Sequence, residues 1–143
     1  MKQVVFVSLL IFSFACGNKP SDKTNDRATN LLLEKTAVTF EEKFHNFGKL
    51  KAGEIVVHTF VFTNTGNNKY QIEQVVADCA CINTRFSEEL IKPGEKGKIE
   101  IEFNTAGTAG REYKTIEVYG NSKELKHLAI FAEVKNEILD IKY

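Results

Sequence analysis

The sequence predicts an all-β protein whose folded part is one immunoglobulin-like β-sandwich of about seven strands. Apolar residues recur with a period of two from residue 37 onward, which is the pattern of strands with one buried face. Turn-forming residues interrupt these runs at intervals of about 8 to 15 residues, and no convincing amphipathic helix occurs. Short, regularly spaced strands without helices are typical of a sandwich.

The strand pattern is clearest at residues 98–103, where Ile99, Ile101 and Phe103 alternate with charged residues. This alternation predicts one face in the core and one face in solvent. Residues 56–62 are apolar on both faces, which is typical of a central strand. The other runs expected to form strands are residues 37–40, 44–50, 70–76, 114–118 and 128–134.

Turn residues separate the expected strands. Pro93 and Gly94 suit the two central positions of a type II turn, because proline fixes φ and glycine supplies a positive φ. Residues 64–68, 106–110 and 120–122 are further turns by composition. Residues 87–90 are compatible with a single helical turn.

Charge and composition exclude several classes of function. The chain has 19 Lys and Arg residues and 19 Asp and Glu residues, so its formal net charge is zero. Without a basic cluster, no nucleic-acid partner is expected. The sequence contains no phosphate-binding loop, nucleophile elbow or paired-carboxylate site, so we expect no enzyme activity and no cofactor.

The N-terminal residues predict an export signal. Residues 4–14 form an apolar run of about 11 residues after a lysine. A membrane-spanning helix needs about 20 residues, so this run fits a secretory signal peptide over residues 1–15. Ala15 precedes Cys16, which is the pattern of a lipobox with a lipidated cysteine, although Ser13 stands where leucine is more common. The alternative is ordinary secretion without a lipid.

The rest of the chain divides into a tether, a domain and a tail. Residues 17–27 contain no aliphatic or aromatic residue, so we expect residues 16–36 to be a flexible tether. The immunoglobulin-like domain is expected at residues 37–136, followed by a tail at residues 137–143. A lipid anchor predicts a place in the bacterial cell envelope. Gly17, where aspartate would signal retention, favours the outer membrane, on its periplasmic or surface face.

Five motifs occur in one order along the chain: residues 44–54, residues 58–66 (which end in Asn64-Thr65-Gly66), Cys79-Ala80-Cys81, residues 93–97 and residues 118–121. With these motifs the chain resembles the bacterial family catalogued as domain of unknown function 1573, many members of which are lipoproteins. That family is similar to the immunoglobulin-like modules of the Hydin and major-sperm-protein type. The resemblance covers roughly residues 40–134. It implies the fold and the location but no activity.

The chain departs from the family pattern at two places. Family members usually have Cys-Gly-Cys-Thr where this chain has Cys79-Ala80-Cys81-Ile82, and aspartate is common where Asn46 stands. Glycine permits a positive φ between the cysteines, whereas alanine largely excludes it. A role that needs a tight turn or an acid at these positions is therefore not implied for this chain.

Cys79 and Cys81 are the only thiols in the expected domain. In an extended strand their Cβ atoms would lie about 7 Å apart, whereas a disulfide needs about 3.8 Å, so a bridge requires a local turn. Three interpretations stay open: a packed structural pair, a disulfide that exchanges with a partner, and a soft-metal site completed by His45 or His58. We expect oxidation rather than metal binding, and an accessible position because the strand ends near Asp78.

His45, His58 and His127 are too scattered to form a metal motif by spacing. His58 shares a strand face with Phe60 and Phe62, so we expect it at the edge of the core, bonded to the backbone. His127 is expected to be solvated.

The leading hypothesis is a membrane-tethered, non-catalytic interaction or assembly module of the bacterial cell envelope. Its partners would be the membrane, through the lipid on Cys16, and a protein that binds an exposed strand edge or the apolar tail. The alternative is a thiol-redox or soft-metal-handling lipoprotein that uses Cys79 and Cys81. Counting free thiols with and without reductant distinguishes the two hypotheses.

Overall fold

The computed structural model of the chain describes residues 33–135, which form eight β-strands. The expected signal peptide, Cys16, most of the tether and the tail at residues 137–143 lie outside the described residues. The strands are β1 (Val38–Phe40), β2 (Phe44–Lys51), β3 (Ile55–Asn64), β4 (Ile72–Ala77), β5 (Ile82–Phe86), β6 (Lys96–Asn104), β7 (Gly110–Gly120) and β8 (Lys126–Lys135).

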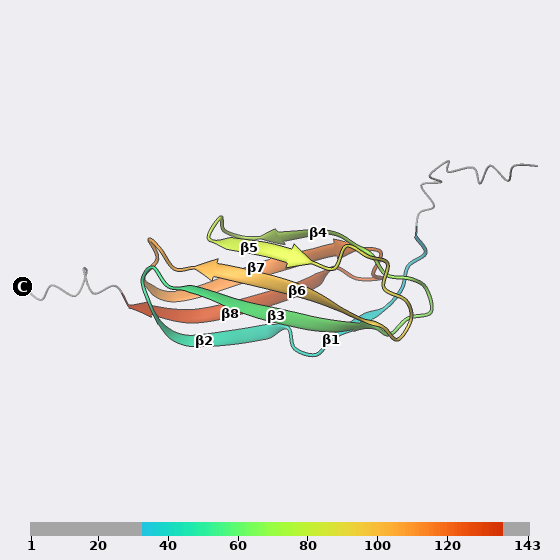
Figure 1. Ribbon diagram of the computed structural model, residues 1–143, viewed down its shortest axis with the longest axis horizontal. Coiled ribbons are helices and arrows are strands. Elements are labelled where there is room, and N and C mark those ends of the chain that lie inside the picture. Colours follow the sequence, from blue (N-terminus) through green and yellow to red (C-terminus); the bar gives the residue numbers. More distant parts are fainter. Residues whose placement is uncertain (1–32, 136–143) are drawn as a thin grey trace, which may run out of the picture. The chain divides into compact units, whose positions relative to one another are not determined.

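The strands form two stacked four-stranded sheets (Figure 1). One sheet has the order β1-β3-β6-β5 and the other has the order β2-β8-β7-β4. β2 pairs with β8 in parallel, and the remaining neighbours are antiparallel. This architecture confirms the predicted immunoglobulin-like sandwich.

The core lies between the sheets and follows the predicted alternation. In β6, Ile99, Ile101 and Phe103 are fully buried, while the intervening charged residues face outward. β3 contributes Phe60 and Phe62 to the same core. Because every second residue of each strand faces inward, the two sheets enclose one continuous apolar layer. The predicted strand registers of β3 and β6 are therefore confirmed.

Two local expectations are decided by the structure, and one strand is added to those expected. Gly94 has a φ of 81°, and the Glu95 N–H donates to the Lys92 carbonyl at 3.0 Å, which confirms the turn at Pro93-Gly94. The helical turn expected at residues 87–90 is wrong, because residues 33–135 contain no helix. β5 was not expected from the sequence, although Ile82, Thr84 and Phe86 do alternate inward.

None of the described residues belongs to a helix that could cross a membrane.

Asn64 at the end of β3 is completely buried and its side chain makes hydrogen bonds with four other residues. It donates to the carbonyls of Asn68 and Ile91, both at 2.8 Å, and accepts from Thr36 Oγ1 and Gly66 N, both at 3.1 Å. All of its hydrogen-bonding capacity is thus used inside the protein. The Asn64-Thr65-Gly66 motif is therefore structural. Thr36, which the sequence analysis places in the tether, lies inside the folded domain.

The assigned inward faces can be checked by substitution. Ile101→Ala removes a fully buried side chain from β6 and should lower the free energy of unfolding by about 2–5 kcal/mol. Glu100→Ala, one position earlier, loses only an exposed ion pair with Arg85 and should cost under about 0.5 kcal/mol. Urea denaturation measures both values. Equal losses for the two variants would show that the strand register is wrong.

Candidate functional site

Residues 41–43 carry the chain from one sheet to the other. β1 ends at Phe40 in the first sheet and β2 begins at Phe44 in the second. The Glu41 N–H donates to the Val61 carbonyl of β3 at 3.0 Å, and the Lys43 carbonyl accepts from the Ala129 N–H of β8 at 2.8 Å. These two bonds fix the crossing to both sheets, with Glu42 between them.

The side chains of His45 and His58 stack on each other beside this crossing. His45 comes from β2 and His58 from β3, and both are half-buried. Their ring centroids are 3.6 Å apart and the ring planes differ by 9°. The edge of Phe47 lies against His45 at 4.6 Å, and Phe60 lies against His58 at 4.7 Å. The two imidazoles are thus held between aromatic rings at the margin of the core.

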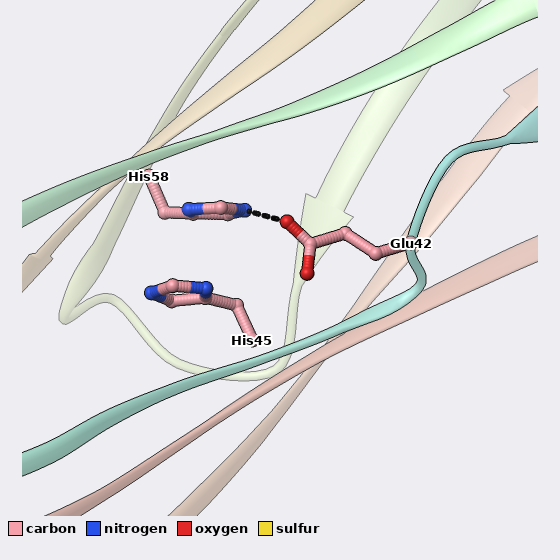
Figure 2. Close-up of side chains that lie close together, drawn as sticks. All are labelled: Glu42, His45 and His58. Atoms are coloured by element: carbon pink, nitrogen blue, oxygen red, sulfur yellow. Dashed lines mark ion pairs between the residues drawn. The ribbon is translucent and has the colours of Figure 1, made fainter.

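Glu42 brings a carboxylate to the same place. Its Oε1 atom lies 3.0 Å from Nε2 of His58, and the side chains are 48% and 15% exposed, respectively. Figure 2 shows the carboxylate at the nitrogen-bearing edge of the two rings. The His58 nitrogen is buried and makes no well-aligned hydrogen bond within the described residues, so the contact is an ion-pair approach. Within the described residues, Nε2 of His58 therefore faces the Glu42 carboxylate and not a backbone carbonyl.

The surroundings of His58 favour its neutral form. Burial lowers the pKa of His58 below its ordinary value of 6.5, and the charge of His45 lowers this pKa further. The Glu42 carboxylate acts in the opposite direction with a smaller effect. Glu42, His45 and His58 offer one ligand atom each, and these atoms lie within 4.8 Å of one another. The cluster thus combines imidazole nitrogens with a carboxylate.

Glu42 belongs to no motif that would mark it as a site residue in the sequence. The residue precedes the strand that carries His45 by only two positions, and this short spacing is its one sequence signal. Its approach to His58 depends on the chain crossing between sheets, which spacing alone does not show. His127 lies elsewhere, on β8, with its side chain 62% exposed and Nδ1 3.9 Å from Glu117.

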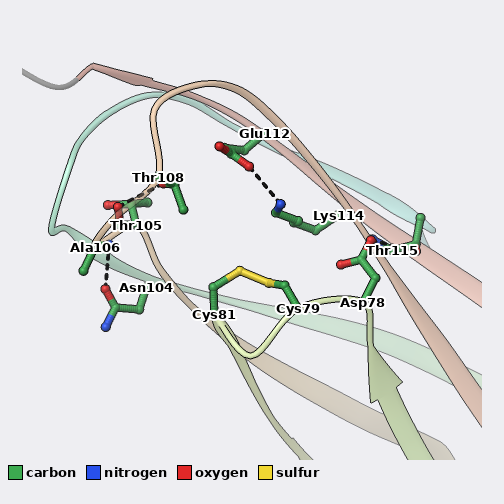
Figure 3. Close-up of a disulfide and its surroundings, with 10 residues drawn as sticks. All are labelled: Asp78, Cys79, Cys81, Asn104, Thr105, Ala106, Thr108, Glu112, Lys114 and Thr115. Carbon is green, nitrogen blue, oxygen red and sulfur yellow. Dashed lines mark hydrogen bonds and ion pairs between the residues drawn. A yellow bond between two sulfur atoms is a disulfide. The ribbon is translucent and has the colours of Figure 1, made fainter. Parts of the chain in front are cut away.

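The two cysteines lie at another crossing between the sheets. β4 ends at Ala77 in one sheet and β5 begins at Ile82 in the other. Cys79 and Cys81 are joined by a disulfide within this crossing (Figure 3). The Asp78 carboxylate accepts hydrogen bonds from the backbone N–H and the hydroxyl of Thr115, at 2.8 and 3.0 Å. The corner between β4 and β5 is therefore hydrogen-bonded to β7 and also closed by its own disulfide.

The corner closes without a glycine between the cysteines. The Ile82 N–H donates to the Cys79 carbonyl at 3.3 Å, and the Cα atoms of Cys79 and Cys81 are 5.2 Å apart. No residue other than glycine has a positive φ in the described chain, so Ala80 fits the turn in an ordinary conformation. Both cysteines are half-buried and pack against the core.

The cysteines and the histidines do not form one cluster. The ligand group of Glu42, His45 and His58 includes neither sulfur atom. A disulfide sulfur is also no thiolate, which is the form that binds soft metals. The structure thus separates residues that the sequence analysis combined in one possible metal site.

The first half of β3 has an unpaired backbone edge. β1 pairs with only three residues at the far end of β3. Figure 1 shows β1 beside that end of β3. In an antiparallel ladder, alternate residues direct both backbone groups to the same neighbour. Val61 bonds toward the β1 side, so Ile55, Val57 and Thr59 also point their N–H and C=O groups to that side. No residue in the range 33–135 pairs with these groups, which we call the β3 edge.

The disulfide can be checked in the native protein. Alkylation before reduction should leave Cys79 and Cys81 unlabelled, whereas reduction should expose two labels on the peptide that contains them. The Cys79→Ser, Cys81→Ser double variant should lower the free energy of unfolding by less than about 2 kcal/mol, since the closed loop is short. Peptide mass spectrometry and urea denaturation provide the measurements. Full labelling without reductant would contradict the disulfide.

Comparison with solved structures shows the same fold in proteins of low sequence identity. A protein of unknown function from Porphyromonas gingivalis W83 has 17% identity and a TM-score of 0.62, over 71% of this chain and 48% of that protein. The ASH/PapD-like domain 7 of human CEP192 has 13% identity and a TM-score of 0.60, over 94% of this chain and 99% of that domain.

The VesB protease of Vibrio cholerae has 14% identity and a TM-score of 0.58, over 67% of this chain and 31% of the protease. The chain thus spans about half of the Porphyromonas protein and about a third of the protease. At these identities the likenesses show the fold alone. No protein with a curated description matches the chain by sequence. The sequence profile of one family matches residues 38–134, which is more than half of the chain, so the chain belongs to the family described as protein of unknown function (DUF1573).

Proposed function

We propose that the protein is a lipid-anchored, non-catalytic interaction module of the bacterial cell envelope. Its domain would bind an extended segment of another envelope protein as an added strand along the β3 edge. The observation that carries this proposal is the row of unpaired backbone groups at Ile55, Val57 and Thr59. Such a row is a template for strand addition, because backbone hydrogen bonds supply the affinity.

The side chains at the β3 edge favour binding over protection. Ile55 is 57% exposed and Val57 is 53% exposed. Proteins commonly protect an edge strand with lysine, proline or a bulge. Residues 55–59 contain neither lysine nor proline, and their pairing with β6 is regular. An extended segment laid along this edge would cover both apolar side chains.

The charges beside the edge indicate the chemistry of the partner. Glu102 of β6 is the pairing partner of Val57, and Glu42 lies on the crossing between β1 and β2. Glu102 and Glu42 are acidic, and neither lysine nor arginine occurs within residues 55–59. A complementary segment would alternate apolar residues with lysine or arginine, because opposite charges across an interface favour encounter and register.

The sequence that precedes the domain supports the lipid anchor in this proposal. The Ala15-Cys16 junction supports lipidation of Cys16, in a membrane of the envelope that we propose to be the outer membrane. A tether of about 20 residues has a root-mean-square reach of about 25 Å. That reach would let the domain meet proteins that stand clear of the lipid headgroups.

Lipidation is tested at Cys16. Mass spectrometry of the mature N-terminus should show acyl chains on Cys16, and the wild-type chain should fractionate with membranes. Cys16→Ala should release the protein from the membrane fraction without changing the thermal melt of the domain. An unmodified mature terminus, or membrane association that survives this substitution, would contradict the anchor.

Strand addition is tested in two steps. A photo-crosslinking residue at Thr59 identifies the contacting segment in cells of the source bacterium, and a synthetic peptide of that segment is then titrated against the purified chain. Val57→Pro removes an N–H of the β3 edge and no ladder bond, so binding should weaken about tenfold or more while the protein stays folded. Val57→Thr keeps the donor and should bind within about threefold of wild type.

Two further variants make the result decisive. Val57→Lys introduces a protective charge at the β3 edge and should also weaken binding of a basic segment, even if the proline variant fails to fold. Tyr113→Ser changes an exposed ring on the other sheet, where Tyr113 stacks with Phe44 at 6.4 Å. This variant should bind normally. Loss of binding at Tyr113 with retention at Val57 would place the interface on the other sheet and overturn the proposal.

A further inference from the structure

The geometry points to a binding site for one divalent transition-metal ion, Zn²⁺ being the expected occupant, formed by Glu42, His45 and His58. The inference concerns a site other than the β3 edge and does not depend on strand addition there. It also differs from the sequence-based hypothesis, because no cysteine takes part.

The donor set is one that zinc uses. Two imidazole nitrogens and one carboxylate oxygen, with an open fourth position, are the protein ligands of some known zinc sites. The three ligand atoms already lie within 4.8 Å of one another. Ligands of one tetrahedral zinc ion are about 3.3 Å apart, because each bond is about 2.0 to 2.1 Å long. Binding therefore requires a contraction of about 1.5 Å or less.

Small side-chain movements of His45 and Glu42 can supply this contraction. Stacked rings direct their lone pairs side by side, so one ring must turn for both nitrogens to face the same ion (Figure 2). His58 is 15% exposed and fixed between Phe60 and the other imidazole, so we assign the turn to His45 on the edge strand β2. Glu42, at 48% exposure on the crossing, can follow the ion.

The electrostatics of the cluster favour a cation. Zinc binds imidazole through the lone pair of a ring nitrogen, and Nε2 of His58 already lies 3.0 Å from the Glu42 carboxylate. The Glu42 carboxylate then gives the three groups a net negative charge. A divalent ion would also relieve the buried His58 nitrogen, which has no well-aligned hydrogen bond among the described residues. A metal ion would thus bind this nitrogen and the Glu42 carboxylate that faces it at 3.0 Å.

The site can be observed directly because the chain has only three histidines. The full chain, purified without a polyhistidine tag and with its disulfide intact, is freed of metal with a chelator and titrated with Zn²⁺. Calorimetry should give one zinc ion per chain. Imidazole NMR signals of His45 and His58 should shift together, while those of His127, which is exposed on β8, should not. Absence of stoichiometric binding, or shifts confined to His127, would overturn the inference.

Matched variants assign the ligands. Glu42→Gln keeps the shape of the side chain and should weaken Zn²⁺ binding about tenfold or more, since one of three protein ligands is weakened. The neighbouring Glu41 pairs with Lys96 and lies outside the cluster. The control variant Glu41→Gln should therefore bind Zn²⁺ within about twofold of wild type. His45→Asn should abolish the one-to-one binding. Equal affinities of the Glu42 and Glu41 variants would contradict the site.

Two controls keep the outcome independent of folding and of sulfur. Glu42 is exposed on the crossing, so the thermal melt of metal-free Glu42→Gln should match wild type even if a histidine variant unfolds. The Cys79→Ser, Cys81→Ser variant should retain zinc binding, because its sulfur atoms lie outside the cluster. Loss of zinc in this cysteine variant would assign the ion to sulfur and overturn the proposal.

Discussion

The crossing of the chain between the two sheets at Glu41, Glu42 and Lys43 sets the geometry of both surfaces to which we assign functions. Because the chain leaves the first sheet after Phe40, β1 covers only the end of β3 and the remaining backbone of β3 has no neighbour within residues 33–135. The same crossing starts β2 at Phe44. His45 of β2 therefore faces inward and stacks on His58 of β3. One short connection thus creates an unpaired edge and a polar cluster side by side.

Much of the fold follows from the sequence because strand burial has a strict period of two. Ile99, Ile101 and Phe103 face the core for the reason that the alternation indicated, and the turn at Pro93-Gly94 follows from the chemistry of those two residues. β5 was missed because its five residues follow the cysteine turn at once and include two polar and one charged residue. The alternation could not show how strands pair, so the apolar segment 56–62 was interpreted as central, although its first residues form an edge.

The candidate sites were harder to predict than the core. Asn64 belongs to a family motif, yet its four hydrogen bonds show a structural role that no spacing rule reveals. Glu42 and His58 lie 16 positions apart and meet only through the pairing of sheets. The disulfide depended on whether Ala80 permits a turn, and the turn is made at an ordinary φ. In each case the deciding fact is a long-range contact or a local backbone conformation.

The central claim is that the first half of β3 presents unpaired backbone groups on one side. Residue-resolved amide hydrogen exchange of the full chain measures this directly. The account predicts rapid exchange at Val57 and Thr59, whose N–H groups face the open side, and slow exchange at Val56 and His58, whose N–H groups face β6. Uniformly slow exchange at all four amides would show that another segment already covers the β3 edge, and would contradict the account.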